Sequence, residues 1–208
     1  SASSSTVRRV IPAFSGGADI SVRMLLTHGS GLPASLPLDH DWQGSDAALA
    51  LACASVPTHE PDRVFRYSDI NFILLGAIVE RIVGRSLDAL AQDWIFGPLG
   101  MADTGYHPLQ RHAAARIAPT EVEDGVPLRG AVHDPTARRM DGVAGHAGIF
   151  GTAADVGRFA RMVLEGGTLD GATVLKESTV ALMTRVASPP GLAPRALGWD
   201  IDSPYARP

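Results

Sequence analysis

Three polar residues stand directly before a long apolar run. Tyr67, Ser68 and Asp69 precede residues 70–76, in which Asn71 is the only polar side chain. A phenol and a carboxylate at the start of a buried helix would be rigidly anchored near the positive end of the helix dipole, where they could move protons or contact a substrate. On spacing alone, a plain helix cap is the simpler interpretation, with Ser68 or Asp69 satisfying free N–H groups and Tyr67 packing.

The common catalytic and cofactor motifs are absent from the sequence. Ser30, in His28-Gly29-Ser30-Gly31, is out of register for G-x-S-x-G, and no glycine-rich loop has the spacing of a nucleotide site. The seven histidines include no H-E-x-x-H and no pair four residues apart, and Cys53 is the only cysteine. We therefore expect no metal ligands, no cofactor and no internal disulfide.

The composition is that of one globular domain. The chain has 208 residues, 45% hydrophobic and 19% charged, with a net charge of −4. Mild acidity without clustered basic residues argues against nucleic acid as a partner. The longest apolar run lies in residues 71–83 and carries Glu80 and Arg81, so it is too short and too charged for the roughly 20 residues that span a bilayer. We expect no membrane span.

Periodicity and capping signals predict mostly helices. The predicted spans are 21–28 with Asp19 as its cap, 46–54, 70–83 ending at Gly84, 87–96, a helix from Thr152 to Gly166-Gly167, and 177–185. The span 70–83 is apolar almost all round, which places it in the middle of a fold. Asp124-Gly125 indicates a hairpin at a sheet edge, and residues 197–201 are a candidate strand. The predicted class is mainly α with minor β.

Five blocks of the sequence resemble one enzyme family. Residues 67–76 resemble the Tyr-x-Asn element of serine β-lactamases, penicillin-binding proteins and related esterases. The other blocks resemble further elements of that family in the same order, and they are residues 22–33, 95–105, 145–155 and 197–200. The resemblance is strongest to the class C-like branch, which includes family VIII-type esterases and members that act in cell-wall turnover.

The resemblance implies part of a known fold. It implies the helical region plus part of the α/β region of the serine β-lactamase/DD-peptidase fold, with an incomplete sheet. Residues 7–208 would form a single incomplete domain, and residues 1–6 a disordered or linker start. The chain would be truncated at both ends.

The resemblance also assigns roles to two residues. In the family a Ser-x-x-Lys serine attacks a carbonyl, and the lysine and a tyrosine manage its proton. By resemblance Tyr67 is the catalytic proton-transfer residue, and Asp69 takes the position of a substrate-contacting asparagine. Asp69 departs from the family pattern, because a carboxylate accepts hydrogen bonds but cannot donate them as an amide does.

Two family motifs are missing from the chain. The only lysine, Lys176, has Thr173 three positions before it, and His146-Ala147-Gly148 leads directly into the helix predicted at Thr152. We therefore expect the Ser-x-x-Lys nucleophile upstream of this chain and the Lys/His-Thr-Gly motif downstream. The chain alone is predicted to be inactive. His28 and His146 are interpreted as structural histidines, and Cys53 as a small buried hydrophobe.

The predicted function is that of the central portion of a serine hydrolase. It would cleave an amide or ester, in a β-lactam, a peptidoglycan peptide or muropeptide, or a small ester, through an acyl-serine intermediate. One alternative is a catalytically dead binding module, and another is an unrelated helical scaffold that matches by chance. No signal peptide is visible in the chain, and the family suggests a periplasmic or extracellular location. The sequence leaves open the choice among lactamase, DD-peptidase, amidase and esterase, and the oligomeric state.

Overall fold

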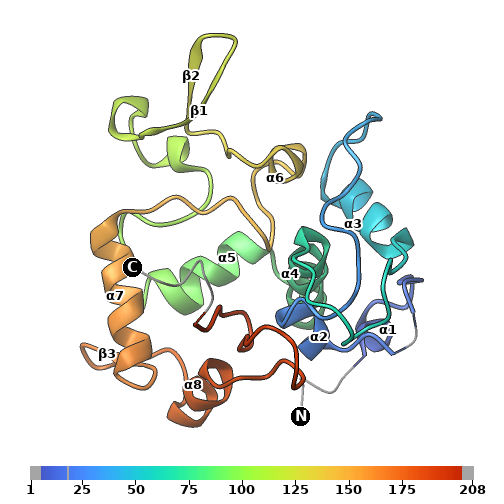
Figure 1. Ribbon diagram of the computed structural model, residues 1–208. Helices are drawn as coiled ribbons and strands as arrows, with labels where there is room; N and C mark the ends of the chain where they lie inside the picture. The colour runs from blue at the N-terminus through green and yellow to red at the C-terminus, as the bar shows by residue number, and fades with distance from the viewer. Residues whose placement is uncertain (1–5, 18, 203–208) are drawn as a thin grey trace.

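The computed structural model describes residues 6–17 and 19–202, and this part of the chain is mainly helical (Figure 1). The helices are α1 (Val7–Val10), α2 (Val22–Leu26), α3 (Ser45–Ala54), α4 (Asp69–Val83), α5 (Leu87–Ala91), α6 (Pro135–Arg139), α7 (Ala153–Leu164) and α8 (Glu177–Thr184). A π-helical segment η2 (Gln92–Phe96) continues α5, and two 3₁₀ turns follow, η3 (Pro108–Gln110) and η4 (Ala114–Arg116). The predicted class, mainly α with minor β, is confirmed.

The strands described form two small antiparallel sheets. β1 (Pro119–Glu123) pairs with β2 (Val126–Arg129), and β3 (Thr168–Leu169) pairs with β4 (Ala172–Thr173). The first pair is the hairpin predicted around Asp124-Gly125, and both turn residues adopt positive φ angles, of 49° and 78°. The hairpin projects from the body of the molecule (Figure 1). A partial sheet is what the family resemblance implied.

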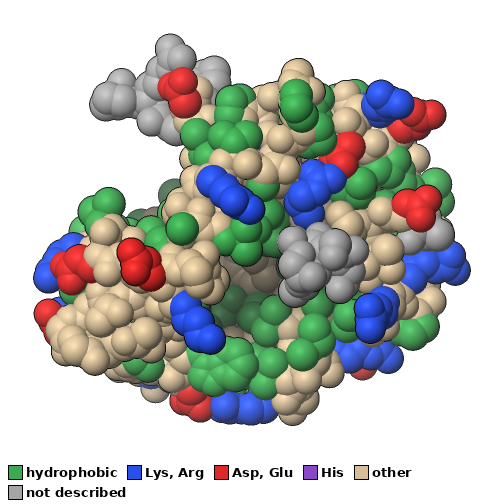
Figure 2. Space-filling model, turned by 90° about the horizontal axis from the view of Figure 1, so that it is seen from below, with side chains coloured by type: hydrophobic (Ala, Val, Ile, Leu, Met, Phe, Trp, Pro, Cys, Tyr) green, Lys and Arg blue, Asp and Glu red, His purple; other side chains and the backbone are tan. Residues whose placement is uncertain are grey.

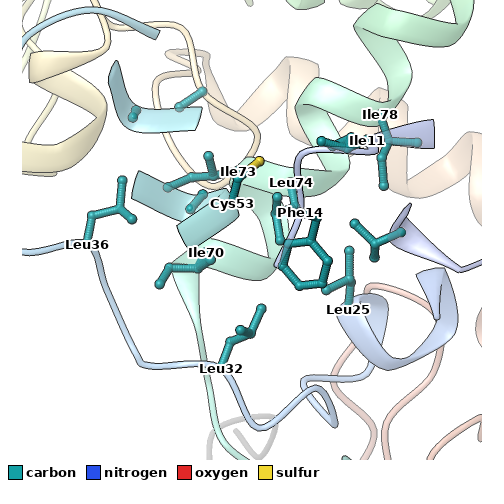
Figure 3. Close-up of a cluster of buried hydrophobic side chains, with 14 of the residues drawn as sticks. Ile11, Phe14, Leu25, Leu32, Leu36, Cys53, Ile70, Ile73, Leu74 and Ile78 are labelled. Atoms are coloured by element: carbon teal, nitrogen blue, oxygen red, sulfur yellow. The ribbon is translucent and has the colours of Figure 1, made fainter. Parts of the chain in front are cut away.

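Helix α4 is the central element of the fold. It packs against α1, α2, α3 and α5, and its buried Ile70, Ile73 and Leu74 lie in one apolar cluster with side chains from α2 and α3 (Figure 3). It ends as predicted, at Gly84, whose φ of 73° is left-handed and whose N–H donates to the Glu80 carbonyl over 2.7 Å. Cys53 is buried in the same cluster, as expected.

A second apolar cluster lies beneath α7. It contains Phe96, Leu99, Met101, Met162 and Leu169. Helix α7 begins as predicted, because the Thr152 hydroxyl accepts the Asp155 N–H over 3.2 Å. The Asp155 carboxylate in turn accepts the Asp103 N–H and the Thr104 hydroxyl, over 2.9 and 2.8 Å. These bonds tie the start of α7 to the loop after α5 and η2.

An apolar groove of about 670 Å³ runs along the other side of α4. Figure 2 shows a hollow lined by hydrophobic side chains on the lower face of the molecule. The groove is lined by side chains of α2, α4, α5, η2 and α7, among them Val22, Leu26, Phe72, Leu75, Val79, Ile95 and Phe159. Because α4 lies between the core and this groove, it carries apolar residues on both sides. That position explains the pattern that placed it in the middle of the fold.

Three sequence expectations need correction. The cap of α2 is Ser21 and not Asp19, since the Ser21 hydroxyl accepts the Met24 N–H over 3.3 Å. Residues 197–201 form no strand; Arg195 and Asp200 make an isolated bridge around Gly198, whose φ is 82°. The helix predicted over 87–96 changes from α to π geometry at Gln92.

Of the predicted linker at residues 1–6, residues 1–5 lie outside the described part, and Thr6 forms a bridge with Ser21. Among the helices in residues 6–17 and 19–202, none is both long enough and apolar enough to cross a membrane.

The backbone at Gly145 lies close to the backbone of α4. A Cβ added at Gly145 would lie 2.0 Å from the Phe72 carbonyl oxygen of α4. We expect Gly145→Ala to lower the free energy of unfolding by about 2–3 kcal/mol, because backbone must move to admit the methyl group. Urea unfolding followed by circular dichroism measures the change.

The matched control is Gly157→Ala in α7, where an added Cβ meets nothing within 4 Å. This change should be neutral or stabilising by about 0.5–1 kcal/mol, since alanine favours the helix. Equal stabilities of the two variants would contradict the proposed packing.

Candidate active site

The start of α4 is fixed by a neighbouring loop and not by a side-chain cap. The Ser68 hydroxyl donates to the Pro33 carbonyl over 2.6 Å, and the Asp69 N–H donates to the Ala34 carbonyl over 2.7 Å. Ser68 makes no capping hydrogen bond with its side chain. The simple interpretation of the Tyr67-Ser68-Asp69 sequence as a cap is therefore wrong for Ser68.

A buried histidine accepts hydrogen bonds from the first turn of α4. The His28 Nδ1 lies 3.1 Å from both the Ser68 backbone nitrogen and the Asn71 Nδ2. The Asn71 Oδ1 accepts the Ser30 hydroxyl over 2.6 Å. These four residues are all buried. A backbone N–H can only donate, so Nδ1 is the unprotonated nitrogen and the neutral ring carries its proton on Nε2.

The surroundings of His28 keep its ring neutral. Burial, helped by the positive charge of Arg195, lowers the pKa of His28 from 6.5 to about 4. The residue follows α2 in a left-handed conformation, with φ at 55°, and Gly29 closes that helix by donating to the Met24 carbonyl over 2.8 Å. His28 is a buried structural histidine, as expected, and residues 29–31 do end the helix.

The same imidazole ring packs against Tyr67. The two ring centroids lie 4.6 Å apart at an interplanar angle of 33°, and Phe72 and Phe65 pack on the His28 ring at 5.2 and 6.1 Å. Tyr67 itself remains 57% exposed. Its ring is thus held against a buried aromatic cluster, while much of the side chain is open to solvent.

The side chains of Tyr67 and Asp69 influence each other's pKa. Burial raises the pKa of Tyr67, and so does the negative charge of Asp69, while Arg195 acts in the opposite direction. The phenol is therefore protonated near neutral pH. In this environment Tyr67 can give a proton, and it needs an additional positive charge nearby to act as a base.

Two residues from later in the chain meet Asp69. The His146 Nε2 lies 2.9 Å from the Asp134 Oδ1, and polar atoms of Asp69, Asp134 and His146 all lie within 4.8 Å of one another. Burial raises the pKa of Asp69. Burial acts in the same direction on Asp134, but hydrogen bonds from His146 and the Ala137 N–H outweigh it and leave the pKa of Asp134 lowered.

The structure thus brings Tyr67 and Asp69 together and adds residues that sequence reasoning missed. Asp134 was not singled out, although it precedes Pro135 and caps α6 through the Ala137 N–H, a recognisable pattern. His146, interpreted as structural, lies beside both aspartates. Lys176 follows the β3–β4 hairpin and is the residue before α8.

Comparison with known proteins supports one family. A family model described as Beta-lactamase matches residues 4–206. An N-acetylmuramyl-L-alanine amidase of Bacillus subtilis (strain 168) is 32% identical in an alignment 198 residues long, which covers 84% of this chain and 44% of that protein. A putative D-alanyl-D-alanine carboxypeptidase of Salmonella agona (strain SL483) is 31% identical in an alignment 204 residues long, which covers 86% of this chain and 46% of that protein. The chain spans about half the length of these curated relatives.

Solved structures show the same fold. A putative β-lactamase from Bacteroides dorei aligns with a TM-score of 0.69 at 24% identity, over 92% of this chain and 51% of that one. A penicillin-binding protein homologue from Pyrococcus abyssi aligns with a TM-score of 0.70 at 17% identity, over 94% and 47%. The hydrolase EstCE1 aligns with a TM-score of 0.65 at 23% identity, over 94% and 61%. The resemblance drawn from the five blocks is confirmed, and the unrelated scaffold is excluded.

The neutral state of His28 predicts a pH dependence of stability. The unfolded chain takes up a proton on this residue near pH 6.5, whereas the folded chain does so only near pH 4. The neutral His28 therefore contributes up to about 3 kcal/mol to the free energy of unfolding. This contribution is complete above pH 6.5 and is lost as the pH falls toward 4.

His28→Asn should flatten this dependence, because asparagine tolerates the left-handed backbone and its Oδ1 can accept the same donors without titrating. Denaturant unfolding at pH 7 and pH 4.5 measures the difference. His40→Asn, at an exposed histidine that pairs with Asp39, is the control and should follow the original protein. If His28→Asn loses as much stability on acidification as the original protein, His28 is not held neutral.

Proposed function

The chain belongs to the β-lactamase family, and on this premise we propose that it is the central portion of a serine hydrolase that cleaves an amide or ester through an acyl-serine intermediate. The observation that carries the proposal is the placement of Tyr67. Its ring is held by His28, the charge of Asp69 acts on its phenol, and more than half of the residue is exposed. A phenol that served only to pack would have no need of this exposure.

The proposed chemistry divides the site between this chain and the rest of the enzyme. The nucleophile is a Ser-x-x-Lys serine, which no residue of this chain provides. Its hydroxyl would attack the carbonyl, its proton would pass by way of Tyr67 to the leaving group, and water would then release the acyl group from the serine. Because the phenol is protonated in the environment described, its role as a base requires the lysine of the same motif beside it.

Asp69 would serve two purposes in this scheme. As a carboxylate it could accept a hydrogen bond from the Tyr67 hydroxyl and so orient it. Its negative charge also attracts the cationic lysine that the phenol needs. A substrate N–H could donate to the Asp69 carboxylate, whereas a substrate carbonyl could not be bound there as it could by an asparagine amide.

The relatives support a cell-wall peptide as the substrate class. The Bacillus subtilis relative is named as an amidase of N-acetylmuramyl-L-alanine, and the Salmonella agona relative as a carboxypeptidase of D-alanyl-D-alanine. Both names describe the cleavage of amide bonds in peptidoglycan fragments. We therefore favour a peptidoglycan peptide or muropeptide over a β-lactam or a small ester, and with it a periplasmic or extracellular site of action.

A catalytically dead binding module is the second candidate. Asp69 favours it, because the carboxylate raises the pKa of Tyr67 where the family has a neutral asparagine. Covalent labelling separates the two candidates. The protein expressed from its complete reading frame should react with a fluorescent penicillin or a fluorophosphonate, and replacing one serine in a Ser-x-x-Lys motif should abolish labelling. No labelling under these conditions would support the binding module.

The 208-residue chain by itself should neither be labelled nor hydrolyse nitrocefin or p-nitrophenyl esters faster than buffer. The reason is that a covalent mechanism needs a nucleophile paired with its base, and this chain supplies only Tyr67 and Asp69. Spectrophotometric assays measure the hydrolysis. Serine-dependent turnover by these residues alone would refute the division of the site between two parts of the protein.

Tyr67→Phe in the complete enzyme should lower kcat by about 10²-fold or more, the lower range of general acid–base contributions, because only the hydroxyl is removed. Steady-state kinetics on a muropeptide or an ester measure it. Tyr106→Phe is the control; its buried hydroxyl donates to the Ala144 carbonyl over 3.2 Å, so its loss should cost about 1 kcal/mol of stability and leave kcat near that of the original enzyme. Unchanged kinetics of Tyr67→Phe would remove Tyr67 from the mechanism.

A further inference from the structure

The segment that follows α8 returns to α2. The Arg23 guanidinium donates to the Ala187 carbonyl over 3.2 Å, and the Gly198 N–H donates to the Leu26 carbonyl over 3.1 Å. Because Arg23 and Leu26 both belong to α2, this segment, drawn in red in Figure 1, lies against the helix that leads to His28. It is thus placed to contact the aromatic rings around that histidine.

Arg195 of this segment lies beside a cluster of aromatic rings, which we define as those of His28, Phe65 and Phe72. Its guanidinium carbon lies over the Phe65 ring, 5.2 Å from the ring centre. We propose that Arg195 is a positioning residue, which holds the aromatic cluster in place against Tyr67 and supplies the phenol with a permanent positive charge. The proposal rests on the function proposed above, because it concerns the proton that Tyr67 would move.

Ring contacts connect the guanidinium to the phenol. The Phe65 ring meets the His28 ring at an interplanar angle of 89°, with the centroids 6.1 Å apart, and the His28 ring lies 4.6 Å from that of Tyr67. A guanidinium within about 6 Å of an aromatic face is attracted by the negative charge of that face. Arg195 therefore holds one end of a row of rings, and Tyr67 lies at the other end.

Several hydrogen bonds fix Arg195. Its Nη1 donates to the Asp200 Oδ1 over 3.2 Å, and its backbone N–H donates to the Ser188 hydroxyl over 3.1 Å. Its carbonyl accepts the N–H groups of Ala187 and Ser188 over 2.8 and 3.1 Å. Because both the backbone and the head group are held, the charge keeps a fixed place relative to the rings, as a preorganised electrostatic role requires.

The guanidinium is buried at a cost that fastening the segment does not explain. The Arg195 side chain is only 13% exposed, and within residues 6–17 and 19–202 only Asp200 forms an ion pair with it. Its Nε is buried and has no hydrogen-bond partner among those residues. Replacing a buried ion pair with apolar side chains is often neutral or stabilising. A segment that needed only to be fastened to α2 would be served better by an apolar side chain here.

The charged groups around Tyr67 act in opposite directions. Burial raises the pKa of the phenol, as do the negative charges of Asp69 and Asp134, whereas the positive charge of Arg195 lowers it. Burial and the same guanidinium also lower the pKa of His28. Since an arginine side chain stays charged at every working pH, Arg195 supplies the part of the positive potential at Tyr67 that does not titrate.

The experiment uses the protein from its complete reading frame and compares Arg195→Gln with Arg195→Lys. Glutamine removes the charge, and lysine keeps the charge without the planar group. Nitrogen NMR of labelled histidine and carbon NMR of labelled tyrosine follow the protonation of His28 and Tyr67, and Tyr67→Phe assigns the phenol signal. These titrations require no hydrolase activity, so they separate this proposal from the proposed function.

Arg195→Gln should strengthen proton binding by His28 by about threefold or more, and it should lower the ratio of phenolate to phenol at Tyr67 by a similar factor at roughly pH 10. Arg195→Lys should stay within about twofold of the original protein in both titrations. Titrations of Arg195→Gln that match the original protein would overturn the proposal. So would equal shifts in both variants, because they would show that the shape of the side chain and not its charge acts on the phenol.

Two further variants test the role of the charge without changing Arg195. Asp200→Asn removes the counter-charge and should shift both titrations in the direction opposite to Arg195→Gln. The absence of this shift would refute the proposal even if Arg195→Gln did not fold. Arg139→Gln is the matched control, because the Arg139 guanidinium lies over the Trp42 ring at the same distance of 5.2 Å, and it should change neither titration.

In an active enzyme the pH profile gives a second readout. The acidic limb of kcat/KM reports the base of the free enzyme, so Arg195→Gln should move this limb to higher pH by about half a pH unit, and Arg195→Lys should leave it in place. A lower rate without a shift of the limb would indicate a purely structural role and contradict the proposal. An inactive original protein would refute the proposed hydrolase, and the NMR titrations would then decide on Arg195.

Discussion

A single unprotonated nitrogen organises the region around the candidate site. The His28 Nδ1 accepts hydrogen bonds from the Ser68 backbone and from Asn71 in the first turn of α4, and its ring supports Tyr67. This arrangement requires a neutral ring, because a protonated Nδ1 would face two donors. The buried, neutral imidazole of His28 therefore fixes where α4 begins and where the Tyr67 phenol lies.

The apolar character of α4 is the second constraint. One side of the helix lies in the main core, and the other lines the groove of about 670 Å³. The main core supports only one side of α4. The first turn of α4 is nevertheless fixed, because the loop at Pro33 and Ala34 and the His28 network hold it by hydrogen bonds. The groove has no cover within the described residues, and the chain spans about half the length of its curated relatives.

Local signals in the sequence predicted much of the fold but little of the site. Gly84, Thr152 and Asp124-Gly125 mark element ends through their own backbone preferences, so those boundaries could be predicted. Residues 197–201 could not, because their apolar alternation is interrupted by the left-handed turn at Gly198. The cap of α2 was placed two residues early, since Asp19 and Ser21 are both acceptable caps by type.

The site depends on contacts that no local pattern encodes. Tyr67 and Asp69 were found because they are neighbours in a motif. The link between His28 and Tyr67, and the meeting of Asp69 with Asp134 and His146, arise only when separate helices pack. Asn71 was visible as a lone amide in an apolar run, and that anomaly was the one signal that could have revealed the buried network.

The arrangement at the start of α4 depends on the neutral His28 ring, and nitrogen NMR of the histidine-labelled protein observes this ring directly. Long-range proton–nitrogen spectra distinguish the two neutral tautomers and the charged form. We expect His28 to carry its proton on Nε2 and to keep this neutral tautomer from pH 7 down to about pH 5. A signal from the Nδ1-protonated tautomer, or a titration near the ordinary value of 6.5, would contradict it.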